Sequence, residues 1–392
     1  MKNSILITGY PYVRENFLKV FSFYPSDEKL FFLLPKIWKA KSGKVIYYAS
    51  KKENIYTTKA FFYHSNYPII GGLLKGWMPA FPYYLWRLKK RGLFLVYSCS
   101  EPTLLSTLYN GFWTKLFGLK HLVASWENIP LEQKWSGLIH WFRLFIFNLN
   151  LFFSDGLIAG NSKGAKIFAR YTKKPIVVIP FHGLDPGLFN PTSGTSRKFR
   201  EKDFSGFIAY TFIGAVDFRK GIHIALKAFK RVIAKSPNVR FIIAGSGKDE
   251  KKIEEQVKNL NIQDYVLRYP WLSHSEVKDL LSVSDIFVYP SISYGGWEEQ
   301  FGYSMAEASL MEVPVISTRT GSIEAVVIDN VTGILVQPIN ITELAEAMIK
   351  LAKNEDLRKS MGQAGREHII KNFSHKVVAQ KFWQFFHSYY SK

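Results

Sequence analysis

Glu299 and Glu307 stand eight residues apart in the segment EEQFGYSMAE, on either side of the pair Phe301-Gly302. A helix that begins near Phe301 has free backbone N–H groups and a positive dipole end, so its first turn can hold a diphosphate without a metal. Glu307 falls inside this helix, one turn beyond Tyr303 on the same face, where its carboxylate can accept two hydrogen bonds from a ribose diol. Glu299 precedes the helix and can reach sugar hydroxyls. The arrangement suits a nucleotide-sugar site.

The flanking residues indicate the elements that must position these groups. Residues 285–290 are typical of a buried strand, SYGGWEEQ of the loop after it, and Val313 to Ser317 of the next strand. Two arbitrary glutamates would be interpreted as solvated helix charges, because charged residues mostly face water. In an open α/β sheet, however, ligands bind beyond the carboxyl ends of strands, and this loop falls there. The context therefore favours a binding site.

At these residues the chain resembles the retaining glycosyltransferases of family 4, also called glycosyl transferases group 1. The resemblance rests on E-x7-E within EEQFGYSMAE, on PVIST, TGSIEAV and VTGILV after it, and on FIGAVDFRKGI and FIIAGSGKDE upstream. Order and spacing agree over residues 207–372, while residues before Pro175 match only loosely. The resemblance implies the GT-B fold, which is an α/β fold of two Rossmann-like doubly wound domains facing each other across a cleft.

The resemblance also implies roles for the phosphate-binding segment FIGAVDFRKGI. Lys220 occupies the family's usual lysine position, and Gly214 and Gly245 belong to the two glycine turns. Ala215 departs from the pattern, because the family usually has Arg there. Arg219 offers a nearby guanidinium, but adjacent side chains at a helix start point about 100° apart. Two interpretations of Arg219 stay open: it replaces the charge of the missing arginine, or it is a solvated surface cation.

On the acceptor side, relatives often present a histidine after a strand of the first domain. Here the strand His121–Ser125 is followed by WEN, so Glu127 is the candidate for that catalytic position, against an ordinary turn contact. Glu101, after another strand, is a weaker candidate, and His182 is interpreted as structural or cleft-lining. The predicted catalytic residues are Glu299, Lys220 and Glu127, and the predicted donor-binding residues are Glu307, Arg219, Phe301, Gly302, Tyr303, Gly214 and Gly245.

Transfer of a sugar develops positive charge on the sugar carbon and negative charge on the departing diphosphate. No Asp-x-Asp pair occurs in the sequence, so the metal-diphosphate clamp of the other major glycosyltransferase fold is missing, and neither a metal nor a cofactor is expected. Lys220, with or without Arg219, and the helix start at Phe301 to Tyr303 are predicted to stabilise the leaving group, by roughly a hundredfold in rate per well-aimed group. The resemblance implies retention by front-face attack, and a covalent route stays open.

The 392 residues far exceed one ordinary domain, so two α/β domains are expected. We predict an acceptor-side domain over 1–190, a linker over 191–206 because of its Gly, Ser and charge content, a nucleotide-sugar-binding domain over 207–374, and a helix over 375–392 that crosses back onto the first domain. The strands expected in the first domain are Ser4–Thr8, Leu30–Leu34, Val45–Tyr48, Leu93–Tyr97, His121–Ser125, Gly156–Ala159 and Ile176–Ile179.

Charge is divided unevenly along the chain. Residues up to Asn190 hold 25 Lys and Arg against 9 Asp and Glu, a net charge of +16, while the remainder holds 27 against 22, a net charge of +5. Basic clusters at 36–44 and 87–91 are interleaved with Trp and Tyr. Such a surface suits anionic lipid headgroups, at about 1 kcal/mol per cation. Nucleic acid and simple solubility remain alternatives.

The apolar stretch Leu138–Phe153 is interrupted by Arg and Asn and is too short to cross a bilayer. A core helix is favoured over an interfacial one. The single cysteine, Cys99, rules out an internal disulfide, and the apolar run after Met1 is too short for a signal peptide. We therefore expect a cytoplasmic protein that associates peripherally with the cytoplasmic membrane.

The favoured function is transfer of a sugar from a UDP- or GDP-sugar to a lipid-linked glycan or polysaccharide acceptor at the cytoplasmic membrane face. The alternatives are a non-catalytic or nucleic-acid-directed GT-B protein and a nucleotide-sugar epimerase. The glutamate pair and Lys220 favour the transferase. Its expected partners are the nucleotide-sugar, the acceptor and an anionic membrane surface, with nucleic acid disfavoured.

Overall fold

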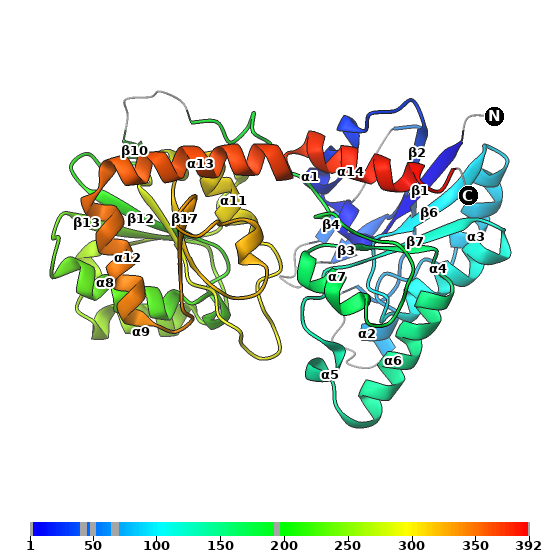
Figure 1. Ribbon diagram of the computed structural model, residues 1–392, viewed down its shortest axis with the longest axis horizontal. Helices are drawn as coiled ribbons and strands as arrows, with labels where there is room; N and C mark the ends of the chain where they lie inside the picture. Colours follow the sequence, from blue (N-terminus) through cyan, green and yellow to red (C-terminus); the bar gives the residue numbers. More distant parts are fainter. Residues whose placement is uncertain (1–2, 40–44, 48–51, 64–69, 192–196, 391–392) are drawn as a thin grey trace. The chain divides into compact units, whose positions relative to one another are not determined.

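The computed structural model describes residues 3–39, 45–47, 52–63, 70–191 and 197–390. The chain forms two compact units (Figure 1), the first made of Met1–Gly183 with His375–Lys392 and the second of Leu184–Ser374. Each unit has a parallel β-sheet with helices packed on it. The predicted α/β class with two doubly wound domains is confirmed.

The sheet of the first unit has seven parallel strands in the order β5-β2-β1-β6-β7-β8-β9. Successive strands step outward from β1 in one direction and then from β6 in the other, so the strand order reverses between β1 and β6. The strands are β1 Ser4–Thr8, β2 Lys29–Pro35, β5 Ile55–Thr58, β6 Leu93–Ser98, β7 Lys120–Ser125, β8 Gly156–Ala159 and β9 Ile176–Val178. The helices are α1 Glu15–Leu18, α2 Ile70–Leu73, α3 Phe81–Lys89, α4 Leu105–Leu116, α5 Leu131–Lys134, α6 Gly137–Phe152, α7 Ser162–Phe168 and α14 His375–His387, with 3-10 helices η1 Tyr10–Val13 and η2 Lys19–Phe23.

One predicted strand of this sheet lies elsewhere. Val45–Tyr47 forms β4, which pairs antiparallel with β3, Ile37–Lys39, outside the main sheet, and Tyr48 lies outside the described residues. The edge position belongs instead to β5, which pairs with β2. The residues of β5 are only half-buried and include two threonines, so their weak apolar signal did not predict a strand.

The two faces of this sheet have separate cores. Ile5 and Ile7 of β1 point to one face, and the intervening Leu6 points to the other, as strand geometry requires. Helix α14 covers the first face, where Phe382 and Phe386 are completely buried. The C-terminal helix therefore contributes to the core of the first unit.

The sheet of the second unit has six parallel strands in the order β14-β13-β12-β15-β16-β17, which reverses between β12 and β15. The strands are β12 Ile208–Ile213, β13 Val239–Ala244, β14 Val266–Tyr269, β15 Ile286–Tyr289, β16 Val315–Thr318 and β17 Gly333–Val336. The helices are α8 Ile222–Ile233, α9 Glu250–Asn259, α10 His274–Ser282, α11 Tyr303–Leu310, α12 Ile341–Lys353 and α13 Glu355–Phe373, with 3-10 helices η3 Phe218–Lys220, η4 Gln263–Tyr265 and η5 Ile323–Ala325. This order is that of the doubly wound nucleotide-binding fold.

The segment 191–206, predicted to be a linker, carries a hairpin of β10, Lys198–Phe199, and β11, Lys202–Asp203. Phe199 is buried, and the Arg197 guanidinium lies 2.6 Å from the Asp285 carboxylate at the start of β15. The described part of the segment therefore belongs to the second unit. Its Gly, Ser and charge content predicted a linker and gave no sign that the Phe199 ring would be buried in the second unit.

Within the described ranges, no helix combines the length and the apolar character that crossing a membrane requires.

Candidate active site

The predicted donor-side residues gather at the carboxyl ends of β12 and β15, where the strand order of the second unit reverses. Ligands of doubly wound sheets bind at such switch points. The loop after β15 is tied to the η3 turn, because the Ser291 hydroxyl and the Ile292 N–H both donate to the Arg219 carbonyl, at 3.0 and 2.9 Å. The loops after β12 and β15 are thereby held side by side.

Lys220 and Glu299 form the centre of this site. The Lys220 Nζ lies 2.6 Å from the Glu299 Oε2, and the two residues are only 8% and 6% exposed. The ammonium also lies 4.3 Å from the centre of the Trp297 ring and 5.2 Å from that of Tyr289. Burial lowers the pKa of Lys220, and the Glu299 carboxylate opposes that shift. The sequence brought these two residues together as catalytic candidates, and the structure places them in contact.

Further contacts fix Glu299. Its carbonyl accepts a hydrogen bond of 2.8 Å from the Ser322 N–H, which belongs to the turn after β16. Burial, followed by the neighbouring Glu299 carboxylate, raises the pKa of the Tyr289 hydroxyl well above its usual range. Tyr289 and Trp297 were not predicted as site residues. Trp297 stands in the Gly-rich donor loop, so a large aromatic ring among glycines was the available signal.

Arg219 is held within its own turn. Its backbone N–H and its Nε contact the Asp217 carboxylate at 3.0 and 3.1 Å, and its guanidinium lies 4.2 Å from the centre of the Trp297 ring. Arg219 and Lys220 therefore share one aromatic neighbour. Asp217, which the sequence analysis did not single out, is the residue that orients this guanidinium.

Helix α11 begins at Tyr303, directly after Gly302, whose φ of 87° is left-handed. A side chain at Gly302 would be strained there, and its Cβ would meet the Met305 side chain at 2.0 Å. The Phe301 ring is buried against the rings of Tyr303 and Phe373, at 4.6 and 5.0 Å. The Phe301 side chain therefore anchors the start of α11 in the core of the second unit.

Glu307 lies in α11 with a side chain that is 14% exposed. The only ionic group within 4 Å that the described residues show is the His274 imidazole, whose Nδ1 lies 3.7 Å from Oε1. Burial raises the pKa of Glu307 to about 8. A protonated carboxyl can donate one hydrogen bond and accept others, which suits a pair of hydroxyl groups.

Gly214 and Gly245 follow β12 and β13. The Gly214 N–H donates to the Ala244 carbonyl at 3.0 Å, and a Cβ on Gly245 would lie 2.0 Å from the Gly214 carbonyl oxygen. Any larger residue at position 245 would push the two turns apart. These glycines keep the strand ends in close contact beside η3.

In the first unit, two candidate carboxylates follow the neighbouring strands β6 and β7, Glu101 after β6 and Glu127 after β7. Glu101 accepts hydrogen bonds from the Ser125 hydroxyl at 2.5 Å and from the Trp126 N–H at 2.9 Å. Glu127 pairs with Lys134. Burial, and then the Glu127 charge, raises the pKa of Glu101. Glu101, the weaker sequence candidate, is the residue that orders the loop carrying Glu127.

The rings of His121 and His182 are held by contacts within the first unit. The His121 ring is completely buried between the Ser98 hydroxyl, at 3.0 Å from Nε2, and the Phe153 carbonyl, at 3.2 Å from Nδ1. Burial lowers the pKa of His121 to about 4. His182 packs against the Phe17 ring at 4.0 Å, and its Nδ1 lies 2.9 Å from the Gly183 carbonyl.

Among the described residues, no group of three or more His, Cys, Asp or Glu side chains is placed to hold a metal ion.

Comparisons with known proteins agree with this geometry. Residues 196–368 match the family model described as Glycosyl transferases group 1. An uncharacterized glycosyltransferase of Methanocaldococcus jannaschii is 32% identical over 58% of this chain and 64% of its own length. A capsular polysaccharide biosynthesis glycosyltransferase of Staphylococcus aureus is 31% identical over 46% of this chain and 45% of its own length. The chain thus spans less than two thirds of either relative.

The crystal structure of Anabaena HepE in complex with UDP superposes with a TM-score of 0.74 at 17% identity, covering 99% of this chain and 100% of that one. This likeness establishes the fold, which is GT-B. Fold and family match together define a GT-B protein. The residues that match the group 1 model, 196–368, lie within its second unit, where the sequence resemblance also falls.

Proposed function

We propose that the protein is a retaining glycosyltransferase that moves a sugar from a nucleotide-sugar to a glycan or lipid-linked acceptor. The buried pair of Lys220 and Glu299 at the switch point carries this proposal. The Staphylococcus aureus relative is named for capsular polysaccharide biosynthesis, and the Anabaena structure contains UDP. The bound UDP supports a UDP-sugar donor, and the name of the relative supports a polymeric acceptor.

In this proposal Lys220 stabilises the departing diphosphate. Its ammonium is preorganised by Glu299 and by two aromatic rings in a site of low dielectric constant, where a fixed charge acts more strongly than in water. Negative charge that develops on the leaving group therefore meets a cation that needs no reorientation. Arg219, oriented by Asp217, supplies a second positive charge beside it.

The remaining donor contacts are assigned to α11. Its start at Gly302 and Tyr303 directs backbone N–H groups and a positive dipole end toward the diphosphate. The Glu307 carboxyl, one turn further along the helix, binds the ribose hydroxyls. Glu299 both holds Lys220 and contacts the transferred sugar. No step in this scheme is assigned to a metal ion.

The acceptor is assigned to the first unit, with Glu127 as the residue nearest the attacking hydroxyl and Glu101 as its positioning residue. The excess of Lys and Arg in the first 190 residues supports work at the cytoplasmic membrane face.

Thermal unfolding with a panel of UDP-, GDP- and ADP-sugars tests the proposal. A cognate donor at a hundred times its dissociation constant adds about 2.7 kcal/mol to the free energy of unfolding. Stabilisation by one nucleotide-sugar, followed by its hydrolysis or transfer, is the expected result, and nuclear magnetic resonance of the product reports retention. Stabilisation by none of the panel would reject the assignment.

A further inference from the structure

Helix α6 is apolar on two opposite faces, and only one of them is covered. Five large apolar residues on the other face are exposed, with Leu138 87% and Trp141 67% accessible; the five are Leu138, Trp141, Phe142, Phe145 and Phe152. At about 100° per residue they lie within an arc of about 100°. Ile146, Phe147 and Leu151 on the opposite side are buried in the first unit. The expectation of a core helix is therefore correct for one face alone.

An apolar cavity opens beside this exposed face. It has a volume of about 440 Å³ and lies between α4 and α6, within the range of about 300–1,000 Å³ that ligand pockets have. Its lining is made of apolar and aromatic side chains, among them Trp77, Leu105, Leu108, Phe112, Leu149 and Phe153. Such a lining offers no charge to a sugar or a phosphate, but it suits a hydrocarbon chain.

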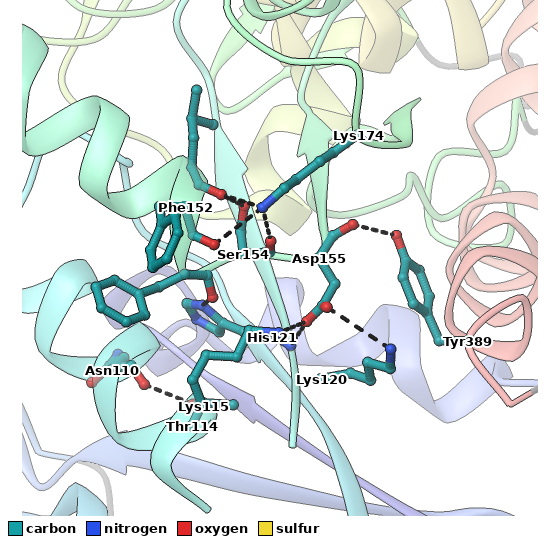
Figure 2. Close-up of polar contacts among 12 residues, drawn as sticks. Asn110, Thr114, Lys115, Lys120, His121, Phe152, Ser154, Asp155, Lys174 and Tyr389 are labelled. Carbon is teal, nitrogen blue, oxygen red and sulfur yellow. Dashed lines mark hydrogen bonds and ion pairs between the residues drawn. The ribbon is translucent and has the colours of Figure 1, made fainter. Parts of the chain in front are cut away.

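Positive charge gathers at the C-terminal end of α6. Lys115 and Lys120 lie 2.6 and 3.9 Å from the Asp155 carboxylate, and Lys174 donates to backbone carbonyls at the end of α6 (Figure 2). Two ammonium groups thus share one carboxylate, and a third, that of Lys174, contacts the carbonyl of Phe152, whose side chain is 73% exposed. A net positive charge remains at this end of the apolar face.

Helix α3 extends the same pattern. Trp86 and Tyr83 are about half exposed, and the Lys90 Nζ lies 4.1 Å from the centre of the Trp86 ring. The Lys89 Nζ donates to the Phe117 carbonyl at 2.7 Å, which joins the basic end of α3 to the end of α4. Figure 1 shows α3, α4 and α6 along one edge of the first unit. None of these three helices contains Asp or Glu.

We propose that this surface docks on an anionic lipid bilayer. It is made of the exposed residues of α6, the mouth of the cavity and the basic and aromatic residues of α3, and is named the lipid face. The cavity receives one hydrocarbon chain. An apolar centre, aromatic side chains and a surround in which lysines outnumber the Asp155 carboxylate match a headgroup layer above acyl chains. A protein partner or a second copy would need the apolar centre but not the net positive charge around it. The inference deepens the proposed function, because a lipid-borne acceptor would meet the enzyme there.

Flotation of the full chain with vesicles tests the proposal in the absence of any nucleotide-sugar. Vesicles of phosphatidylcholine alone are compared with an equal mixture of phosphatidylcholine and phosphatidylglycerol, at low and high salt. We expect flotation with the anionic mixture, weakened by salt because charge contributes to binding. Absence of flotation in every condition would overturn the proposal.

Paired variants then locate the contact. Trp141→Ser with Phe145→Ser should weaken partitioning about tenfold or more for each side chain, because both rings lose a place in the apolar layer. The matched control is Trp271→Ser, since Trp271 is 59% exposed in the second unit. Unchanged partitioning of the double variant, or an equal loss in the control, would overturn the proposal. Normal melting temperatures and a normal donor-induced shift in all variants separate a failure here from a failure of the proposed transferase function.

Brominated acyl chains report insertion directly. In wild type, bromine in the acyl region should quench part of the Trp fluorescence. Trp141→Phe should keep flotation, because the apolar area is nearly preserved, but lose part of that quenching. Concentration-dependent dimerisation that is abolished by Trp141→Ser, together with no quenching in wild type, would assign the face to a second copy and overturn the membrane proposal.

Discussion

The Lys220 ammonium lies 2.6 Å from the Glu299 carboxylate, and their side chains are only 10% and 8% exposed. Lys220 follows β12, whereas Glu299 follows β15, so the pair spans the switch point of the second unit. A buried charge without a partner is costly, whereas a pair in contact satisfies both members. In the proposed function this contact prepares the ammonium for a diphosphate, and it also means that neither charge is buried alone.

Substitution of one member of this pair should impair both stability and turnover. Lys220→Met leaves the Glu299 carboxylate buried alone, so we expect a loss of about 3–5 kcal/mol in the free energy of unfolding and of roughly a hundredfold or more in turnover. Urea unfolding and transfer rates measure the two effects. The double variant Lys220→Met with Glu299→Gln should regain much of the stability but none of the activity. Recovered activity in the double variant would remove Lys220 from the leaving-group role.

Arg219→Ala tests whether a neighbouring guanidinium replaces the arginine that the family usually has at the position of Ala215. Arg219 is oriented by Asp217 and lies over the same Trp297 ring as Lys220, so we expect a loss of roughly a hundredfold in turnover. The control is Arg231→Ala, whose guanidinium contacts the Thr342 hydroxyl on the helices of the second unit. A rate within about twofold of wild type would make Arg219 a bystander.

Removal of metal ions should leave transfer largely intact. The proposed stabilisation of the diphosphate comes from Lys220, Arg219 and the start of α11. Transfer rates measured after exhaustive treatment with EDTA, with and without added Mg²⁺ or Mn²⁺, test this expectation. Strict dependence on a divalent cation would contradict the proposed arrangement of cation and helix dipole.

The strands of the second sheet were predictable because parallel strands covered on both faces are nearly continuous apolar runs. Strands β15 and β16 lie where the apolar runs at 285–290 and Val313–Ser317 predicted them. The contact of Lys220 with Glu299 was only implied, because spacing along the chain carries no distance between separate loops. The roles of Tyr289 and Trp297 were missed for the same reason, since an aromatic ring beside a buried ammonium is a tertiary contact.

Surface placement was the harder inference. The apolar residues of α6 predicted a buried helix, and periodicity alone could not distinguish a helix covered on both faces from one left open on one face. The segment 191–206 shows the reverse case, because its polar composition predicted a linker although Phe199 within it is buried. In both segments the neighbouring elements, rather than the local sequence, decide what is covered.

Glu127→Gln should lower transfer while leaving donor binding unchanged, because Glu127 lies in the first unit and the donor residues lie in the second. A general acid–base contribution is worth about a hundredfold to ten-thousandfold in rate. Donor-induced melting shifts and transfer rates are measured in parallel, with the exposed Glu53→Gln as the control. Glu101→Gln should also lower transfer, because Glu101 accepts hydrogen bonds from Ser125 and Trp126 and thereby orders the loop that carries Glu127. Full transfer by both variants would remove this carboxylate pair from the acceptor side.

Glu307→Gln should change the pH dependence of stability. The carboxyl has a pKa of about 8 in the folded protein because of burial, against about 4.3 in an unfolded chain. Between these values the folded state retains a proton that the unfolded state has lost, so the stability contributed by Glu307 is complete below about pH 4.3 and disappears as pH rises through about 8. Glutamine removes this dependence, and the variant should gain stability relative to wild type as pH rises, by on the order of a few kcal/mol at pH 9.

Urea unfolding of wild type and Glu307→Gln between pH 5 and 9 measures that difference, and calorimetry with the cognate donor measures the second consequence. Glutamine resembles the protonated carboxyl in shape and in its ability to donate and accept, so at pH 6 the variant should bind the donor nearly as well as wild type. Above pH 8 the ionised wild type can form charge-assisted hydrogen bonds, each worth about 1.5–3 kcal/mol, that the variant lacks. The variant should therefore fall behind wild type only as pH rises. Equal affinities across the whole range would remove Glu307 from the ribose.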